Sequence, residues 1–211
     1  MNLNELATSL HDCRQCGLSA NRTQVVFGTG HPNASIMFVG EAPGFHEDKQ
    51  GIPFVGAAGK LLTQLLESVG LSREEIYIAN VVKCRPPNNR NPSPEEIDTC
   101  RPFLEQQVQL IQPKLVCSLG NFATQTLLGR KVGITKVRGQ VFHLPQFVLF
   151  PLLHPAAALH QGGLLTPLRE DFQKLKSVLQ SMMEQSDSPP SSESAPTDSQ
   201  APTLPVQMDL F

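Results

Sequence analysis

Residues 35–44 read SIMFVGEAPG, and this stretch decides the fold of the chain. Its first five residues form an apolar run that is typical of a buried strand, and the glycine that follows ends the run. Three more apolar runs of similar length lie at residues 76–82, 114–119 and 147–153. Short and dense in aliphatic side chains, all four are typical of strands in a parallel sheet that is covered on both faces.

Helical patterns alternate with these predicted strands. The leucines after Lys60 share one helix face, and Gly70 is a good C-terminal cap for that helix. Ser93 is a typical N-cap, with Pro94 and two acids in the first turn behind it. The predicted helices cover residues 60–69, 94–112, 121–128 and 166–183. Strands that alternate with helices in this way predict an α/β fold with a parallel central sheet.

The composition fits one globular domain followed by a polar tail. The chain has 211 residues, of which 40% are hydrophobic, so we expect one core and a single domain over residues 1–183. Five of the 19 acidic residues lie in residues 184–211, which contain no Lys or Arg. The domain is therefore mildly basic, which is compatible with a polyanionic partner. Residues 184–211 are rich in Ser, Pro and acids, and we expect them to be disordered.

Neither a leader nor a membrane span is visible in the sequence. No stretch is long and apolar enough to span a bilayer, and residues 1–16 lack a basic segment followed by an apolar one. We therefore expect the protein in the cytoplasm.

Four of the five cysteines follow a pattern that suits an inorganic site. Cys13 and Cys16 form a Cys-x-x-Cys turn, whereas Cys84 and Cys100 enclose a segment rich in proline and arginine. Four thiolates suit a [4Fe–4S] cluster or a structural zinc ion, although zinc ribbons usually have a second Cys-x-x-Cys pair. Unrelated thiols and disulfides are the other readings, and a chain of this length needs no disulfides. Cys117 lies in an apolar run and is expected to be a core residue.

Four features that could bind a ligand or take part in a reaction lie where predicted strands end or in the loops that follow them. They are the run at residues 40–44, Phe54, Asn80 and His154. In a sheet of this kind, the ligand crevice lies at the carboxyl ends of the strands. Taken singly, the four fit a tight turn, a core side chain, a buried amide and a helix cap. Together, a carboxylate, an aromatic ring, an amide and an imidazole predict a polar pocket for a planar ligand.

In their order along the chain, these motifs resemble the family 4 uracil-DNA glycosylases of bacterial type, which contain an iron–sulfur cluster. The resemblance covers roughly residues 6–179 and rests on Cys-x-x-Cys, GEAPG, PFVG at 53–56, IAN at 78–80, KCRPP at 83–87, Cys100 and HPA at 154–156. It implies a three-layer α/β/α sandwich with a small, mainly parallel, four-stranded sheet. It also implies a [4Fe–4S] cluster held by Cys13, Cys16, Cys84 and Cys100. The implied activity is hydrolytic removal of uracil from DNA in base excision repair, by a monomer in the cytoplasm at the nucleoid.

The resemblance further implies a role for each pocket residue. Phe54 would stack on a flipped uracil, and Asn80 would bond O4 and N3–H, an edge that cytosine presents with reversed polarity. His154 would stabilise negative charge on uracil O2, together with backbone N–H groups near Gly40 and Ala42.

Glu41 is the carboxylate that we expect to matter most for the attacking water. In the first family of uracil-DNA glycosylases, an aspartate directly follows the residue that matches Glu41 and orients the water, whereas this chain has Ala42 there. Glu47 and Asp48 lie nearby in the sequence and are the alternatives.

Two segments are candidates for contact with DNA. The loop between Cys84 and Cys100 contains Arg85 and Arg90, which would face a phosphate backbone. The alternative is a solvated loop with incidental charge. After the HPA motif, Ala158 or Leu159 would insert into the base stack that the uracil leaves.

The final residues, 207–211, read QMDLF. They resemble the pentapeptide by which bacterial repair and replication proteins dock on the β sliding clamp. Gln207, Leu210 and Phe211 would make the contact, and the polar tail would provide reach. Chance is the alternative for so short a motif.

Two other functions remain as alternatives. One is a relative in the same superfamily that binds uracil-DNA covalently through a histidine in an added basic loop. His46 is the only histidine between Gly40 and Leu71, and no arginines flank it. The other alternative is a non-catalytic iron–sulfur adaptor that binds DNA and docks on the clamp.

Overall fold

The computed structural model describes residues 1–187, in which six strands form one mixed sheet. The sheet order is β1-β3-β2-β4-β6-β5, and the four central strands are parallel. The central strands are β2 (Ile36–Gly40), β3 (Tyr77–Asn80), β4 (Leu115–Leu119) and β6 (Val148–Leu152). The predicted α/β class is confirmed. The count of four strands was too low, because β1 (Thr29–Gly30) and β5 (Phe142–His143) are antiparallel edge strands of two residues, too short to show a period.

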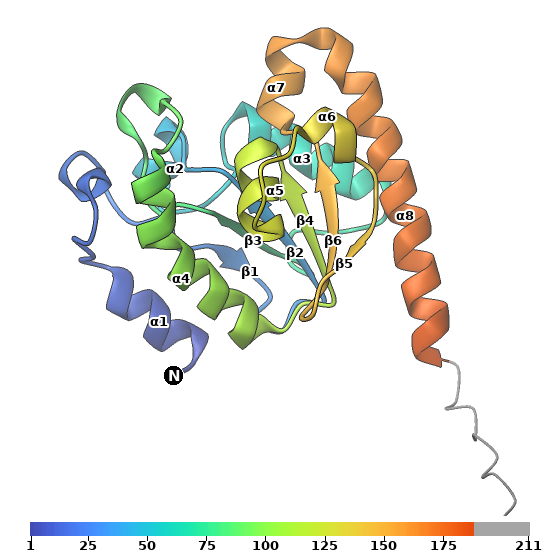
Figure 1. Ribbon diagram of the computed structural model, residues 1–211, viewed down its shortest axis with the longest axis horizontal. Helices are drawn as coiled ribbons and strands as arrows, with labels where there is room; N and C mark the ends of the chain where they lie inside the picture. Colours follow the sequence, from blue (N-terminus) through green and yellow to red (C-terminus); the bar gives the residue numbers. More distant parts are fainter. Residues whose placement is uncertain (188–211) are drawn as a thin grey trace, which may run out of the picture.

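Helices cover both faces of the sheet, which makes three layers (Figure 1). One face packs against α3 (Ala57–Ser68) and α8 (Leu165–Asp187), and the other against α1 (Leu3–Leu10), α4 (Pro94–Ile111) and α5 (Asn121–Leu128). Successive strand residues point to opposite faces, so Phe38 lies in the first core and Met37 in the second. Cys117 is fully buried in the first core, as predicted.

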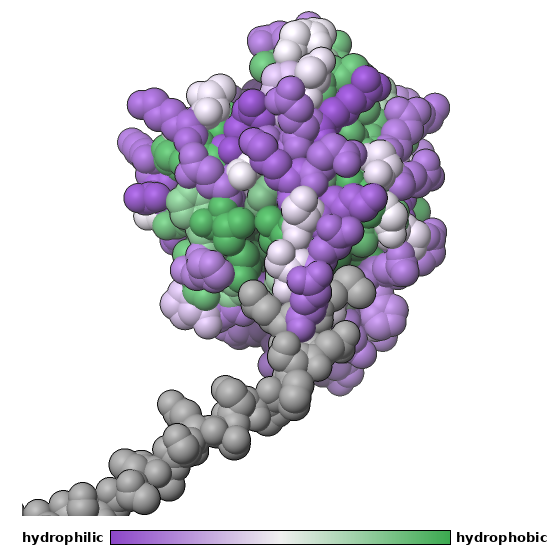
Figure 2. Space-filling model, turned by 90° about the vertical axis from the view of Figure 1, so that its right-hand side faces the viewer, coloured by the Kyte–Doolittle hydropathy of each residue, from purple (hydrophilic) through white to green (hydrophobic). Residues whose placement is uncertain are grey.

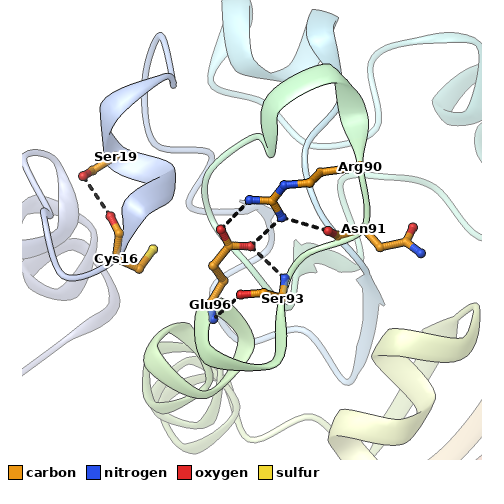
Figure 3. Close-up of polar contacts among 6 residues, drawn as sticks. All are labelled: Cys16, Ser19, Arg90, Asn91, Ser93 and Glu96. Atoms are coloured by element: carbon orange, nitrogen blue, oxygen red, sulfur yellow. Dashed lines mark hydrogen bonds and ion pairs between the residues drawn. The ribbon is translucent and has the colours of Figure 1, made fainter.

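Two predicted helix ends have the expected caps. At the end of α3, Gly70 has φ +80°, and the N–H of Leu71 donates to the carbonyl of Leu66 at 3.0 Å, as in a Schellman motif. At the start of α4, Ser93 and Glu96 form a capping box, and Arg90 donates two hydrogen bonds to the same glutamate (Figure 3).

Several short helices were not predicted, because each is too brief to show a hydrophobic period. Three lie around the carboxyl ends of the strands: α2 (Phe45–Gln50), α6 (Ile134–Val137) and α7 (Pro155–His160) (Figure 1). Three turns of 3₁₀ helix lie at Gly17–Ala20, Pro87–Asn89 and Gly162–Leu164.

Helix α8 closes the domain and extends beyond the predicted boundary at residue 183 to Asp187. Leu168, Phe172 and Leu175 face the core, while the outer side of the helix forms a hydrophilic band (Figure 2). The predicted disorder of the tail and the docking peptide at 207–211 lie outside the described residues. Within residues 1–187, no helix is both long enough and apolar enough to cross a bilayer.

Candidate active site

A cavity of about 440 Å³ opens at the carboxyl ends of the central strands. It is lined by five of the six residues that were predicted to bind the base: Glu41, Ala42, Phe54, Asn80 and His154. The sixth, Gly40, lies directly behind the lining, because a Cβ on it would come within 2.4 Å of Asn80 Oδ1 and 2.7 Å of the Phe54 ring. A glycine is therefore needed where β2 ends, so that the backbone can approach both side chains.

Phe54 is held in an unusual backbone conformation at the wall of the cavity. Its φ is +55°, which is rare for a residue with a side chain and costs free energy that the surroundings must supply. Arg73 donates hydrogen bonds to the carbonyls of Pro53 and Phe54, at 2.9 and 3.1 Å. Glu47 accepts from the N–H groups of Val55 and Gly56, at 3.0 and 2.9 Å. The loop is thus fixed from both sides, which holds the ring in place.

Asn80 presents an unpaired amide to this cavity. Its side chain is 1% exposed, and Oδ1 is buried without a hydrogen-bond partner among the described residues. A buried acceptor that lacks a partner costs about 1–3 kcal/mol. Such a group persists where a ligand supplies the missing donor.

His154 is the N-cap of α7 and is neutral at physiological pH. Its Nδ1 accepts the backbone N–H of Ala156 at 3.1 Å, so the proton of the neutral ring is on Nε2. Burial lowers the pKa of His154 to about 4, and the charge of Glu47 opposes this shift. The ring stacks on Phe54, with 5.7 Å between centroids and 26° between planes. His154 can therefore donate one hydrogen bond, from Nε2, without carrying a charge.

The three carboxylates near the cavity differ in what they can do. Glu41 lines the cavity, its carboxylate has no hydrogen-bond or ion-pair partner within residues 1–187, and burial raises its pKa to about 7. Glu47 also lines the cavity, but its Oε1 holds the Phe54 loop. Asp48 is buried and accepts the N–H of Thr23, outside the cavity lining.

Cys13, Cys16, Cys84 and Cys100 are free thiols. They line a second, small cavity between the start of the chain and α4. Ser19 fixes the turn after Cys16 by donating to its carbonyl at 2.9 Å (Figure 3). Two sulfurs accept hydrogen bonds at 3.4 Å: Cys84 from Arg22 and Cys100 from the backbone N–H of Lys83. Within residues 1–187, no group of three or more His, Cys, Asp or Glu is arranged to hold a single metal ion.

Comparison with known proteins places the chain in a family. The model of the uracil DNA glycosylase superfamily matches residues 27–179. The chain belongs to this superfamily. It is 46% identical to a Type-4 uracil-DNA glycosylase of Sulfurisphaera tokodaii over 83% of this chain and 84% of that protein. For Type-4 uracil-DNA glycosylases of Thermotoga maritima and Archaeoglobus fulgidus, the identities are 47% and 42%, over 79% and 82% of this chain and 89% and 91% of those proteins. The resemblance inferred from the motifs is confirmed.

On this member of the uracil-DNA glycosylase superfamily, one candidate for DNA contact, Arg90, lines the cavity, and Arg85 bonds to a residue of the lining. Arg90 and Asn89 line the cavity, and Asn89 accepts a hydrogen bond from Arg85 at 2.7 Å. Ala158 is buried, whereas Leu159 is 51% exposed, so Leu159 is the one of the two that is free to insert between bases.

Two features of the site were not apparent from the sequence. Arg73, which fixes the Phe54 loop, lies 19 residues from Phe54, in a polar segment with no motif. Lys83 directly precedes Cys84 and the arginine-containing loop in the sequence, but it is 1% exposed and points into the protein. Lys83 therefore cannot contact a phosphate backbone.

Proposed function

We propose that this protein excises uracil from DNA by hydrolysing the N-glycosidic bond, which leaves an abasic site for base excision repair. The observation that carries the proposal is the unpaired Oδ1 of Asn80, buried in one cavity with Phe54 and His154. A base inside a duplex is out of reach of such a cavity, so the nucleotide must flip out of the stack. The cavity volume of about 440 Å³ is in the range of small-molecule sites and has room for a base.

Recognition of the base follows from the polarity of its pairing edge. Oδ1 of Asn80 accepts N3–H of uracil, and the amide nitrogen donates to O4. Cytosine offers an acceptor at N3 and a donor at position 4, so both contacts would be mismatched and buried polar groups left unpaired. Phe54 stacks on the ring and supplies affinity that does not depend on base identity.

Departure of the base requires a donor at O2, where negative charge develops as the bond to C1′ breaks. The Nε2–H of His154 and backbone N–H groups of the loop at residues 40–42 supply it. A neutral donor fixed by its own Nδ1 contact needs no reorganisation as the charge develops. Water then attacks the sugar cation, and Glu41 orients it or takes its proton.

A Glu41→Gln variant is expected to change the pH dependence of excision. Because burial raises the pKa of Glu41 to about 7, this carboxyl is protonated below that pH and ionised above it. If the ionised form assists water, kcat/KM of the wild type rises with pH through about 7. The variant loses this rising limb and about 10²-fold or more of the activity above pH 7. If kcat/KM of the variant still rises with pH through about 7, the rise belongs to another ionisable group.

Release of free uracil from a uracil-containing oligonucleotide tests the proposed function directly. The expected product is free uracil and an abasic site, with no protein attached to the DNA. A heat-stable adduct that survives SDS would instead identify the covalent relative, for which His46 would be the candidate nucleophile. Binding to DNA without any uracil release would identify the adaptor.

We further propose that Cys13, Cys16, Cys84 and Cys100 hold a [4Fe–4S] cluster. In support, the four thiols line one cavity, and two of the sulfurs already accept N–H donors, as cluster thiolates commonly do. Four thiolates on one zinc ion would each lie about 2.3 Å from it, a closer grouping than residues 1–187 contain. When bound, the cluster would cross-link the turn at 13–16, the loop that follows β3 and helix α4.

A Cys84→Ala variant is expected to lose the visible absorbance of the cluster and several kcal/mol of stability, because a ligand set that closes a site contributes to folding. Cys117→Ala is the matched control, since Cys117 is equally buried but lies in the core of the opposite face. The control should keep the absorbance and lose about 1 kcal/mol. Full absorbance in Cys84→Ala would remove Cys84 from the ligand set.

Contact with the DNA strand is assigned to the cavity rim, through Arg85, Arg90 and Leu159. In support, Arg90 lines the cavity, Arg85 bonds to Asn89 of the lining, and the exposed Leu159 stands in the chain between the lining residues Ala157 and His160. Arg85→Ala is expected to weaken binding to all sequences and to reduce the slope of log affinity against log salt by about one. An unchanged slope would argue that the arginine is merely solvated.

The segment 207–211 is proposed to dock on the β sliding clamp through Gln207, Leu210 and Phe211. The support is its sequence and the polar tail that precedes it. Deletion of residues 207–211 should abolish co-purification with the clamp and leave activity on short oligonucleotides within about twofold. Unchanged co-purification would refute the docking role.

A further inference from the structure

Lys83 is a buried charge that the proposed reaction does not use. Only 1% of its surface is exposed, and no salt bridge within residues 1–187 includes it. A buried ammonium costs several kcal/mol unless polar groups or charges compensate it. Its Nζ instead donates to two neutral acceptors, the carbonyl of Asn80 at 2.7 Å and Oε1 of Gln107 at 2.5 Å.

Through these contacts, Lys83 joins the cysteine cavity to the base cavity. Its backbone N–H donates to the sulfur of Cys100, and its side chain reaches back to Asn80, the last residue of β3. Lys83 itself does not line the base cavity. Any effect that it has on the base must therefore act through Asn80.

Gln107 on α4 orients this ammonium. Its Nε2 donates to the carbonyl of Phe27 at 2.9 Å and lies 3.5 Å from the hydroxyl of Tyr77. Because the amide nitrogen must face a carbonyl, Oε1 must face Lys83. Gln107 is fully buried, so no water competes for Oε1.

We propose that Lys83 and Gln107 are positioning residues for base recognition, which hold the Asn80 peptide so that its side-chain amide faces the cavity in one direction. The inference rests on the proposed function. At the strand end, the following N–H, that of Val81, already bonds to the carbonyl of Gly40 at 2.9 Å. The ammonium fixes the other side of the same peptide group, through the Asn80 carbonyl. Both polar groups of the peptide are thus held, which leaves the amide side chain little freedom to turn.

The test compares three variants by their inhibition constants for free uracil and by kcat/KM on DNA. Gln107→Met removes the acceptor at similar volume and is expected to weaken uracil inhibition by about 10-fold to 10²-fold, because small misplacements of a contact group are costly. Lys83→Met removes the ammonium itself, so it should weaken uracil inhibition by a factor similar to that of Gln107→Met. Tyr77→Phe removes a neighbour of Gln107 without touching Lys83, and should match the wild type.

Cluster absorbance and the thermal midpoint are measured on the same samples, and inhibition is measured well below the lowest midpoint. A merely structural role would lower the midpoint but leave the uracil inhibition constant of the folded protein unchanged, and that result would overturn the inference. An unchanged uracil inhibition constant in Lys83→Met would overturn it too. If the wild type releases no uracil, the proposed function itself fails, whereas an active wild type beside an unaffected Gln107→Met refutes only the positioning role.

Discussion

Replacing His154 with alanine is expected to lower kcat for uracil release by about 10²–10³, while KM changes little. The imidazole donates to O2 only as negative charge develops there, so its loss raises the barrier more than it weakens substrate binding. The pKa of about 4 keeps the ring neutral, so the same loss is expected across the pH range from 6 to 9. Single-turnover measurements of uracil release give the rate constant of the chemical step, free of product release.

His154 also caps α7, and this second role must be separated from the first. His154→Asn keeps a side-chain acceptor for the Ala156 N–H, because Asn is a favourable N-cap, but places no donor where Nε2 is. His154→Asn should therefore recover most of the roughly 1 kcal/mol of stability that His154→Ala loses. It should not recover the rate of uracil release. His160→Ala is the control, since His160 lines the same cavity but is exposed. Full activity in His154→Asn would contradict the proposed role.

The central sheet was predictable because its information is local. Four apolar runs predicted its central strands, and the parallel arrangement places all of their carboxyl ends at one edge of the sheet. The position of the cavity followed from that edge, and five of the six residues expected to bind the base line it. Short helices and edge strands of two residues carry no period, so α2, α7, β1 and β5 could not be anticipated.

The residues that support the pocket were not predictable for a different reason. Arg73 and Gln107 contact Phe54 and Lys83, which lie 19 and 24 residues away, through hydrogen bonds that leave no pattern in the sequence. Lys83 stands beside a cysteine and two residues from an arginine, and nothing in this sequence indicates a buried ammonium. Its burial depends on tertiary structure, because α4 packs over it and places the amide of Gln107 within hydrogen-bond distance of Nζ. The left-handed φ of Phe54 likewise depends on Arg73 and Glu47.

Replacing Asn80 with leucine is expected to lower kcat/KM for uracil excision by a factor between about 30 and 3 × 10⁴. Leucine has a similar shape but no polar atoms, so O4 and N3–H of a bound uracil would each be buried without a partner. Each unpaired group costs about 1–3 kcal/mol, and 1.36 kcal/mol corresponds to a factor of ten. Both terms act on binding of the flipped base, so the inhibition constant for free uracil should rise in parallel with the loss in kcat/KM.

The stability of the same variant separates recognition from folding. Oδ1 of Asn80 is buried without a partner in the free protein, so its removal takes away an unfavourable group. The thermal midpoint of Asn80→Leu should therefore stay the same or rise while activity falls. Asn91→Leu is the control, because Asn91 is exposed and lies outside the cavity lining. An Asn80→Leu variant that loses stability and activity together would place Asn80 among the residues that hold the fold, and would contradict its assignment as the reader of the base.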